Sequence, residues 1–169
     1  MGNRAVICNY VEGETLAEFE SNLGKNEKRV YGEHRVGVYL HWNGGEESIR
    51  SFLMYCKLKG YRATDYDNYG WARLCQVIGN FFGGGLSLGI ATVNNLDCDN
   101  GDNGTYLIKN WEIVSKYYDG CWDKEQAKQL DIDLMIENLL EIDQNQPVKE
   151  QLGKEQIEEL VRKEYYPSF

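Results

Sequence analysis

Gly37-Val38-Tyr39-Leu40-His41-Trp42-Asn43-Gly44-Gly45 is the stretch from which the fold can be worked out, because an apolar run leads there directly into a polar turn closed by two glycines. This pattern predicts a strand over 35–42, since β-branched and aromatic residues favour strands while asparagine and glycine favour turns. A rigid strand fixes the position of the loop that follows it. His41, Trp42 and Asn43 are therefore candidate ligand-binding residues.

The segments on either side predict another strand and two helices. Residues 4–10 are short and apolar, which predicts a first strand antiparallel to the second. After the turn, apolar residues recur every three or four positions from Ile49 to Cys56, which indicates an amphipathic helix that ends at Gly60. A second helix with its own apolar stripe is predicted over 69–82.

We expect an α+β fold in which a mainly antiparallel sheet packs against these two central helices. The predicted strands cover residues 4–10, 35–42, 86–93, 105–109 and 111–118. The turn-rich loop 97–104 predicts a hairpin between the strand before it and the strand that returns after it. Residues 11–33 are predicted to be a polar surface excursion. From Trp122 the chain is predicted to be helical and acidic, with Pro147 between two helices. We expect an α+β core domain, 1–120, and an acidic helical tail or arm, 121–169, which either covers the sheet or pairs with another copy to form a homo-oligomer.

The composition is that of a soluble globular protein of one ordinary domain. Of 169 residues, 42% are apolar and 27% are charged, and no run approaches the roughly 18 apolar residues that a membrane span needs. The first residues contain no long apolar segment or cleavage pattern, so we expect no signal peptide. Five widely spaced cysteines without a C-x-x-C pair favour reduced thiols. We therefore expect a cytoplasmic protein that does not bind membranes.

The charge is divided unequally along the chain. Residues 1–96 hold 10 acids and 10 bases, whereas residues 97–169 hold 17 acids and 8 bases, so the whole net charge of −9 lies in the second part. This part would repel nucleic acid, and we expect no direct binding to it. A phosphate-bearing ligand would have to bind the neutral first part, where basic residues cluster from Arg50 to Arg73.

The second predicted helix has a polar face that carries no acid. Arg73, Gln76 and Asn80 share this face, which is either a solvated surface or a row directed at a ligand. Guanidinium groups bind phosphates through charge-assisted hydrogen bonds, and aromatic faces hold bases. The complete set of candidate ligand-binding residues is His41, Trp42, Asn43, Arg62, Tyr69, Arg73, Gln76 and Asn80.

Two other motifs resemble ligand-binding loops. Gly83-Gly84-Gly85 follows a helix and precedes a strand, the reverse of the order that a phosphate-binding loop requires. The acidic octet, residues 97–104, matches neither register of a calcium loop. It is either a turn or an incidental metal site, with Asp97, Asp99 and Asp102 as weak candidate ligands.

The sequence predicts no catalytic centre. It contains only two histidines, His34 and His41, too few for a metal hydrolase. His41 could act with a cysteine such as Cys75, but the spacing does not support this pair. We therefore expect no cofactor and name no catalytic residue.

Two segments resemble a known group of proteins. The opening Met1-Gly2-Asn3-Arg4-Ala5-Val6-Ile7 and the later Val38-Tyr39-Leu40-His41-Trp42-Asn43-Gly44 are similar to small uncharacterised proteins of bacteriophages and prophages, which combine an Asn-Arg strand with a Tyr-x-His-Trp-Asp/Asn-Gly turn. The similarity extends to about residue 118. Leu40 stands where Cys is frequent and Asn43 where Asp is frequent, so a scheme that needs a carboxylate at 43 does not apply. The resemblance implies an accessory phage protein of the kind used against host defence.

Three hypotheses of function follow. The first is a binding protein that sequesters a small nucleotide-like immune signal in a pocket formed by the candidate residues. The second is an acidic, anti-CRISPR-like inhibitor that occupies the nucleic-acid-binding surface of a basic host defence protein, with residues 123–165 replacing the phosphates. The third is an enzyme that degrades the signal, with His41 as its base. In each case we expect the protein to work in the host cytosol.

Overall fold

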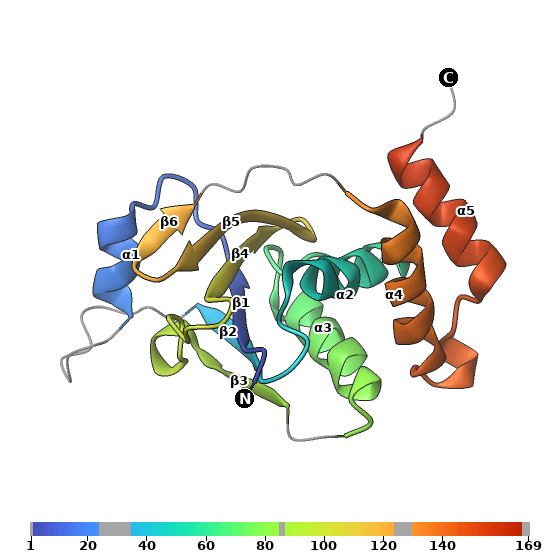
Figure 1. Cartoon of the computed structure of the whole chain (residues 1–169), viewed down its shortest axis with the longest axis horizontal. Helices are drawn as coiled ribbons and strands as arrows, with labels where there is room; N and C mark the ends of the chain where they lie inside the picture. Colours follow the sequence, from blue (N-terminus) through green and yellow to red (C-terminus); the bar gives the residue numbers. More distant parts are fainter. Residues whose placement is uncertain (1, 24–34, 85–86, 124–129, 167–169) are drawn as a thin grey trace.

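The computed structural model describes residues 2–23, 35–84, 87–123 and 130–166. These ranges contain a six-stranded sheet with strand order β3-β2-β1-β4-β5-β6, and five α-helices (Figure 1). The strands are β1 (Ala5–Asn9), β2 (Val36–Leu40), β3 (Leu88–Thr92), β4 (Thr105–Lys109), β5 (Glu112–Tyr118) and β6 (Cys121–Asp123). The helices are α1 (Leu16–Asn22), α2 (Glu46–Leu58), α3 (Asn68–Phe81), α4 (Ile132–Gln144) and α5 (Lys154–Tyr165), with short 3-10 helices η1 (Val93–Asn95) and η2 (Val148–Glu150).

Helices cover both faces of the sheet. α2 and α3 pack on one face, whereas α1 and η1 lie over the other. α4 packs against α2 and α3, and α5 packs against α4 and α2. The C-terminal helices therefore form an outer layer on the side of α2, on the right of Figure 1.

The alternation of side chains along β1 separates two apolar cores. Ala5 and Ile7 face α2 and α3, whereas Val6 and Cys8 face α1, and all four are fully buried. The larger core also contains Met135 and other apolar residues of α4 and α5. Residues beyond 130 thus share their core with the sheet and the central helices.

The structure confirms the α+β class, the two central helices and the antiparallel pairing of β1 with β2. The predicted hairpin across the loop 97–104 is wrong, because β3 pairs with β2 whereas β4 pairs with β1 and β5. The prediction of a mainly antiparallel sheet is wrong, because the sheet is mixed: β1 and β4 pair in parallel. β2, α2, α3 and β3 intervene between these strands, so no local pattern indicates which edge of β1 the chain returns to.

One further prediction is wrong, and two others fall partly on residues outside the described ranges. Residues 121–123 form β6, although the sequence predicts a helix from Trp122. Most of the predicted surface excursion, residues 24–33, lies outside the described residues. Residue 86, the predicted first residue of the third strand, also lies outside them. Within the described ranges, no helix combines the length and the apolar character that crossing a membrane requires.

Candidate functional site

The candidate ligand-binding residues lie in three separate places. One group follows β2 and consists of His41, Trp42 and Asn43. A second group gathers around the N-terminal half of α3 and consists of Arg62, Tyr69, Arg73 and Gln76. Asn80 lies apart, near the C-terminal end of α3, where it faces α4. The described residues therefore do not form the single pocket that the first hypothesis assumes.

The second group and Tyr61 make up one surface, which we call the arginine–tyrosine surface: Tyr61, Arg62, Tyr69, Arg73 and Gln76. Two guanidinium groups lie against the Tyr69 ring, with the Cζ of Arg73 4.3 Å and the Cζ of Arg62 4.8 Å from its centroid. Arg73 donates hydrogen bonds from Nη2 to the Tyr69 hydroxyl (2.5 Å) and from Nη1 to Gln76 Oε1 (2.8 Å). Its Cζ is also 5.9 Å from the Tyr61 ring. These cation–π contacts and hydrogen bonds hold the side chains of the surface in one arrangement.

Arg73 forms no ion pair with a carboxylate of the described residues, and its two side-chain partners are neutral. A guanidinium has five N–H donors, so part of its donor capacity stays available. Arg62 lies 3.4 Å from Asp67, but its side chain is 62% exposed, and such an exposed pair is weak. Two cations thus lie against the ring of Tyr69, which is 42% exposed, and the 75% exposed Tyr66 belongs to the same 61–67 segment as Arg62.

Hydrogen bonds hold residues 61–67, the segment that contains Arg62, against the sheet. Thr64 Oγ1 donates to Asn9 Oδ1 at the end of β1 (2.6 Å), and Trp111 Nε1 donates to the carbonyl oxygen of Tyr61 (2.9 Å). The segment is therefore tied both to β1 and to the turn between β4 and β5. A surface fixed in this way loses little conformational entropy when a ligand binds.

Gly70 is the point at which α3 touches this segment. A Cβ at this position would lie 2.6 Å from the carbonyl oxygen of Arg62 and 2.8 Å from the backbone nitrogen of Thr64. Both are backbone atoms, so no change of rotamer can relieve the contact. The close approach that places Arg62 beside Tyr69 depends on the missing side chain.

Gly70→Ala should lower the free energy of unfolding by about 1–3 kcal/mol, the usual cost of overpacking, and move Arg62 away from Tyr69. Chemical denaturation followed by circular dichroism measures the first effect. Gly79→Ala is the matched control on the same helix, since its Cβ would meet only a Leu88 side-chain atom at 3.9 Å. The control should be neutral or stabilising. Equal stability of the two variants would contradict the role given to Gly70.

The group after β2 makes mainly local contacts. The Tyr39 hydroxyl and His41 Nδ1 are 2.9 Å apart, and the Trp42 ring, 45% exposed, packs edge-on against the imidazole with centroids 5.0 Å apart. Asn3 N–H donates to the His41 carbonyl oxygen (2.8 Å), so the two segments that carry the phage resemblance lie side by side. Asn43 adopts a positive φ of 57°, as its place in the turn requires. Among the described residues, the side-chain partners of His41 are Tyr39 and Trp42, and neither is a serine or a cysteine.

The acidic octet forms a turn around Asn100. Its Oδ1 accepts three backbone N–H groups of the turn. Asp102 accepts from Arg4 Nε (2.7 Å), and this hydrogen bond lowers the pKa of Asp102, while Asp97 lies 3.7 Å from the same guanidinium. Asp99 accepts a backbone N–H from the turn between β5 and β6. The three weak metal candidates thus have protein partners, and no group of three or more His, Cys, Asp or Glu within the described ranges could hold a metal ion.

Asn80 belongs to the contact between α3 and α4. Its Nδ2 donates to Gln146 Oε1 (2.9 Å), and the buried Gln146 side chain donates in turn to the carbonyl oxygens of Val77 and Ile142 (both 3.1 Å). The side chain that the sequence places in a row with Arg73 and Gln76 is therefore used to join two helices.

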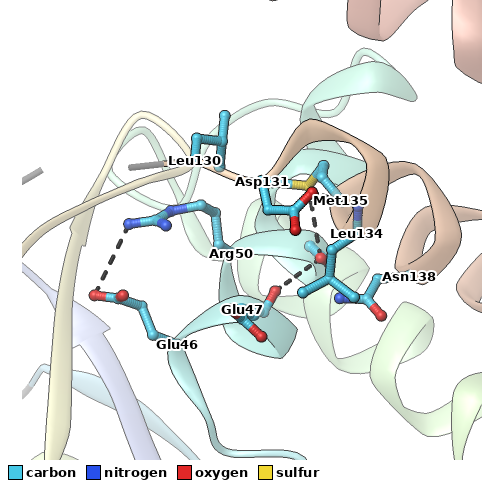
Figure 2. Close-up of a pocket in the computed structure, with 9 residues that line it drawn as sticks. Glu46, Glu47, Arg50, Leu130, Asp131, Leu134, Met135 and Asn138 are labelled. Atoms are coloured by element: carbon cyan, nitrogen blue, oxygen red, sulfur yellow. Dashed lines mark hydrogen bonds and ion pairs between the residues drawn. The ribbon is translucent and has the colours of Figure 1, made fainter. Parts of the chain in front are cut away.

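Figure 2 shows a cavity between α2 and the start of α4 that does not suit an anionic ligand. Its volume is about 80 Å³, far below the roughly 300 Å³ at which small-molecule sites begin. Glu46, Glu47 and Asp131 contribute carboxylates to its lining, and Arg50, the cation there, lies 3.8 Å from Glu46. The Ser51 hydroxyl donates to the Glu47 carbonyl oxygen (2.7 Å). Both its size and its charge argue against this cavity as the site of an anionic ligand.

Comparison with known proteins gives no match: no family model, no curated protein and no solved structure is similar to this chain. The site must therefore be argued from its geometry. Sequence reasoning missed Tyr61 and Gly70. The signal that could have found Gly70 is a glycine in the first turn of a predicted helix, where it has no role in turn formation.

Proposed function

We propose that the chain acts by binding and that the arginine–tyrosine surface takes a small nucleotide-like ligand. The observation that carries this proposal is the environment of Arg73. Its guanidinium is stacked on Tyr69 and hydrogen-bonded to neutral groups, so its position is fixed while it forms no ion pair with a carboxylate of the described residues. A phosphate would meet a cation that is already oriented.

The neighbouring groups suit the two parts of a nucleotide. Arg62 and Arg73 offer charge-assisted hydrogen bonds to phosphate, and the exposed ring of Tyr66, in the same segment as Arg62, offers a face on which a base stacks. The Tyr61 hydroxyl is neutral at pH 7 and does not repel an anion, and burial raises its pKa further. The phage resemblance supports a setting in the host cytosol, where capture of a nucleotide immune signal would blunt defence.

Arg73→Gln should weaken binding about 10- to 100-fold, because a hydrogen bond to a charged group contributes about 1.5–3 kcal/mol. The measurement is a thermal-shift screen with cyclic nucleotides and ADP-ribose derivatives, followed by calorimetric titration of any ligand that raises the melting temperature. Arg162→Gln is the matched control, since Arg162 is an exposed arginine on α5. Absence of a shift with every compound, or equal weakening by both variants, would remove the proposal. Formation of product under multiple turnover would show that the protein degrades the ligand instead of sequestering it.

A second function is favoured by the outer face of α4. Asp133, Glu137 and Glu141 are exposed and follow one another at intervals of four residues, so their carboxylates lie about 6 Å apart along the helix axis. None of them forms an ion pair with a described residue. A regular row of negative charge of this kind could occupy the nucleic-acid groove of a basic host protein.

The two functions predict opposite results from two sets of variants. Replacing Asp133, Glu137 and Glu141 with their amides would abolish salt-sensitive binding to a basic effector and leave nucleotide binding intact. Arg73→Gln would weaken nucleotide binding and leave the salt-sensitive binding to a basic effector intact. Co-purification of the effector at low and high salt, beside the nucleotide titration, separates them.

A further inference from the structure

β3 is an edge strand whose outer side has no partner among the described residues. It pairs with β2 in an antiparallel ladder in which His41 N–H donates to the Ser87 carbonyl oxygen and Val93 N–H donates to that of Arg35 (both 2.8 Å). Hydrogen-bonded pairs alternate along such a ladder. The N–H and C=O groups of Leu88, Ile90 and Thr92 therefore point away from β2, along the free edge of the sheet.

This edge lacks the features that usually protect one. Residues 81–96 contain no charged residue and no proline, and Ile90 on β3 is 61% exposed. The opposite edge, β6, has only three residues and ends in Asp123, so it is short and charged. Unprotected edges of this kind pair with another strand.

The edge is complementary to itself. In an antiparallel pair of two β3 strands related by a two-fold axis at Ile90, each Ile90 lies opposite its copy and each Leu88 lies opposite Thr92. All three outward residues of each strand then exchange N–H and C=O hydrogen bonds. The two exposed Ile90 side chains meet on the same face of the combined sheet, where their burial adds apolar contact.

Charge also favours a second copy at this edge. The net charge of −9 belongs to residues 97–169, while β3 lies within the balanced part of the chain. In Figure 1, β3 lies along the lower edge of the molecule, whereas α4 and α5 lie at its right-hand end. Two copies joined at β3 therefore keep their acidic helices apart, which limits like-charge repulsion. We propose that the chain forms a symmetric dimer through antiparallel pairing of β3 with β3 of a second copy.

The test compares the wild type with Ile90→Lys by sedimentation equilibrium over a range of concentrations. The wild type should have twice the chain mass of 19.5 kDa at high concentration, and Ile90→Lys should stay monomeric. Val148→Lys is the matched control, because Val148 is an apolar residue 85% exposed on η2. It should dimerise like the wild type. Circular dichroism establishes that each variant is folded, and Ile90→Glu provides a second charged variant if Ile90→Lys is not.

Hydrogen exchange identifies the contact itself. The amides of Leu88, Ile90 and Thr92 should exchange slowly in the wild type at high concentration and rapidly in Ile90→Lys. A monomeric wild type at every concentration would overturn the proposal, whatever other strand the edge binds. A dimer that survives Ile90→Lys, with the three amides unprotected, would place the contact elsewhere and overturn it equally.

Discussion

Asp143→Ala should lower the free energy of unfolding by about 3–4 kcal/mol, a large effect for one polar residue, because each hydrogen bond to a charged group contributes about 1.5–3 kcal/mol. The Asp143 carboxylate is 3% exposed and accepts three hydrogen bonds. They come from the Tyr55 hydroxyl (2.6 Å) and from the backbone N–H groups of Leu152 (2.8 Å) and Gly153 (2.9 Å). It therefore joins α2, α4 and the start of α5.

Removing this carboxylate would leave the buried Tyr55 hydroxyl and two backbone N–H groups without their acceptor. Burial, and then the hydrogen bond to Asp143, raise the pKa of Tyr55, so its hydroxyl stays protonated as a donor. Urea denaturation measures the loss. Gln144→Ala is the control, since the next residue of α4 is exposed, and it should change stability by less than about 0.5 kcal/mol. Similar stabilities for Asp143→Ala and Gln144→Ala would contradict the role given to Asp143.

Glu14→Ala should lower the free energy of unfolding by about 3 kcal/mol, because it removes one partner from a buried ion pair. Glu14 and Arg35 form two hydrogen bonds, Nη2 to Oε2 at 2.5 Å and Nη1 to Oε1 at 3.0 Å. Their side chains are only 5% and 9% exposed. Arg35 also donates to the Asn9 carbonyl oxygen and lies 5.6 Å from the Phe19 ring centroid, so the pair holds the start of the α1 segment on the sheet.

Glu12→Ala provides the comparison within the same segment. Glu12 pairs with Lys109 at 3.1 Å, but the two side chains are 75% and 50% exposed, so their pair contributes less than about 1 kcal/mol. Thermal or urea unfolding of both variants measures how much stability each one loses. If Glu12→Ala is as damaging as Glu14→Ala, burial is not what makes the Glu14 pair important.

The parts of the fold that the sequence predicts are those set by local periodicity. The three- and four-residue spacing from Ile49 to Cys56 predicts α2, and the apolar stripe of residues 69–82 predicts α3. The parallel pairing of β1 with β4 depends on contacts about 100 residues apart, which periodicity does not record. β6 is too short, at three residues, to show an alternating pattern.

Local periodicity also explains why the sequence predicts only part of the candidate site. Arg73 and Gln76 are three residues apart on one helix, so their proximity follows from helix geometry alone. Asn80 lies one further turn along that face, but its side chain is hydrogen-bonded to Gln146, just after α4. Only tertiary packing determines this contact. Tyr61 joins the surface because the 61–67 segment is tied to the sheet, again through contacts distant in sequence.

The central claim, that the arginine–tyrosine surface binds an anionic nucleotide-like ligand, is tested most directly by nuclear magnetic resonance. A ¹⁵N-labelled sample would be titrated with ADP-ribose and with a cyclic dinucleotide while backbone amides and arginine Nε–H groups are followed. The account predicts saturable shifts that are largest at Arg62, Tyr69 and Arg73 and that disappear in Arg73→Gln. Saturable shifts confined to the His41 turn or to α4, with Arg73 unchanged, would contradict it.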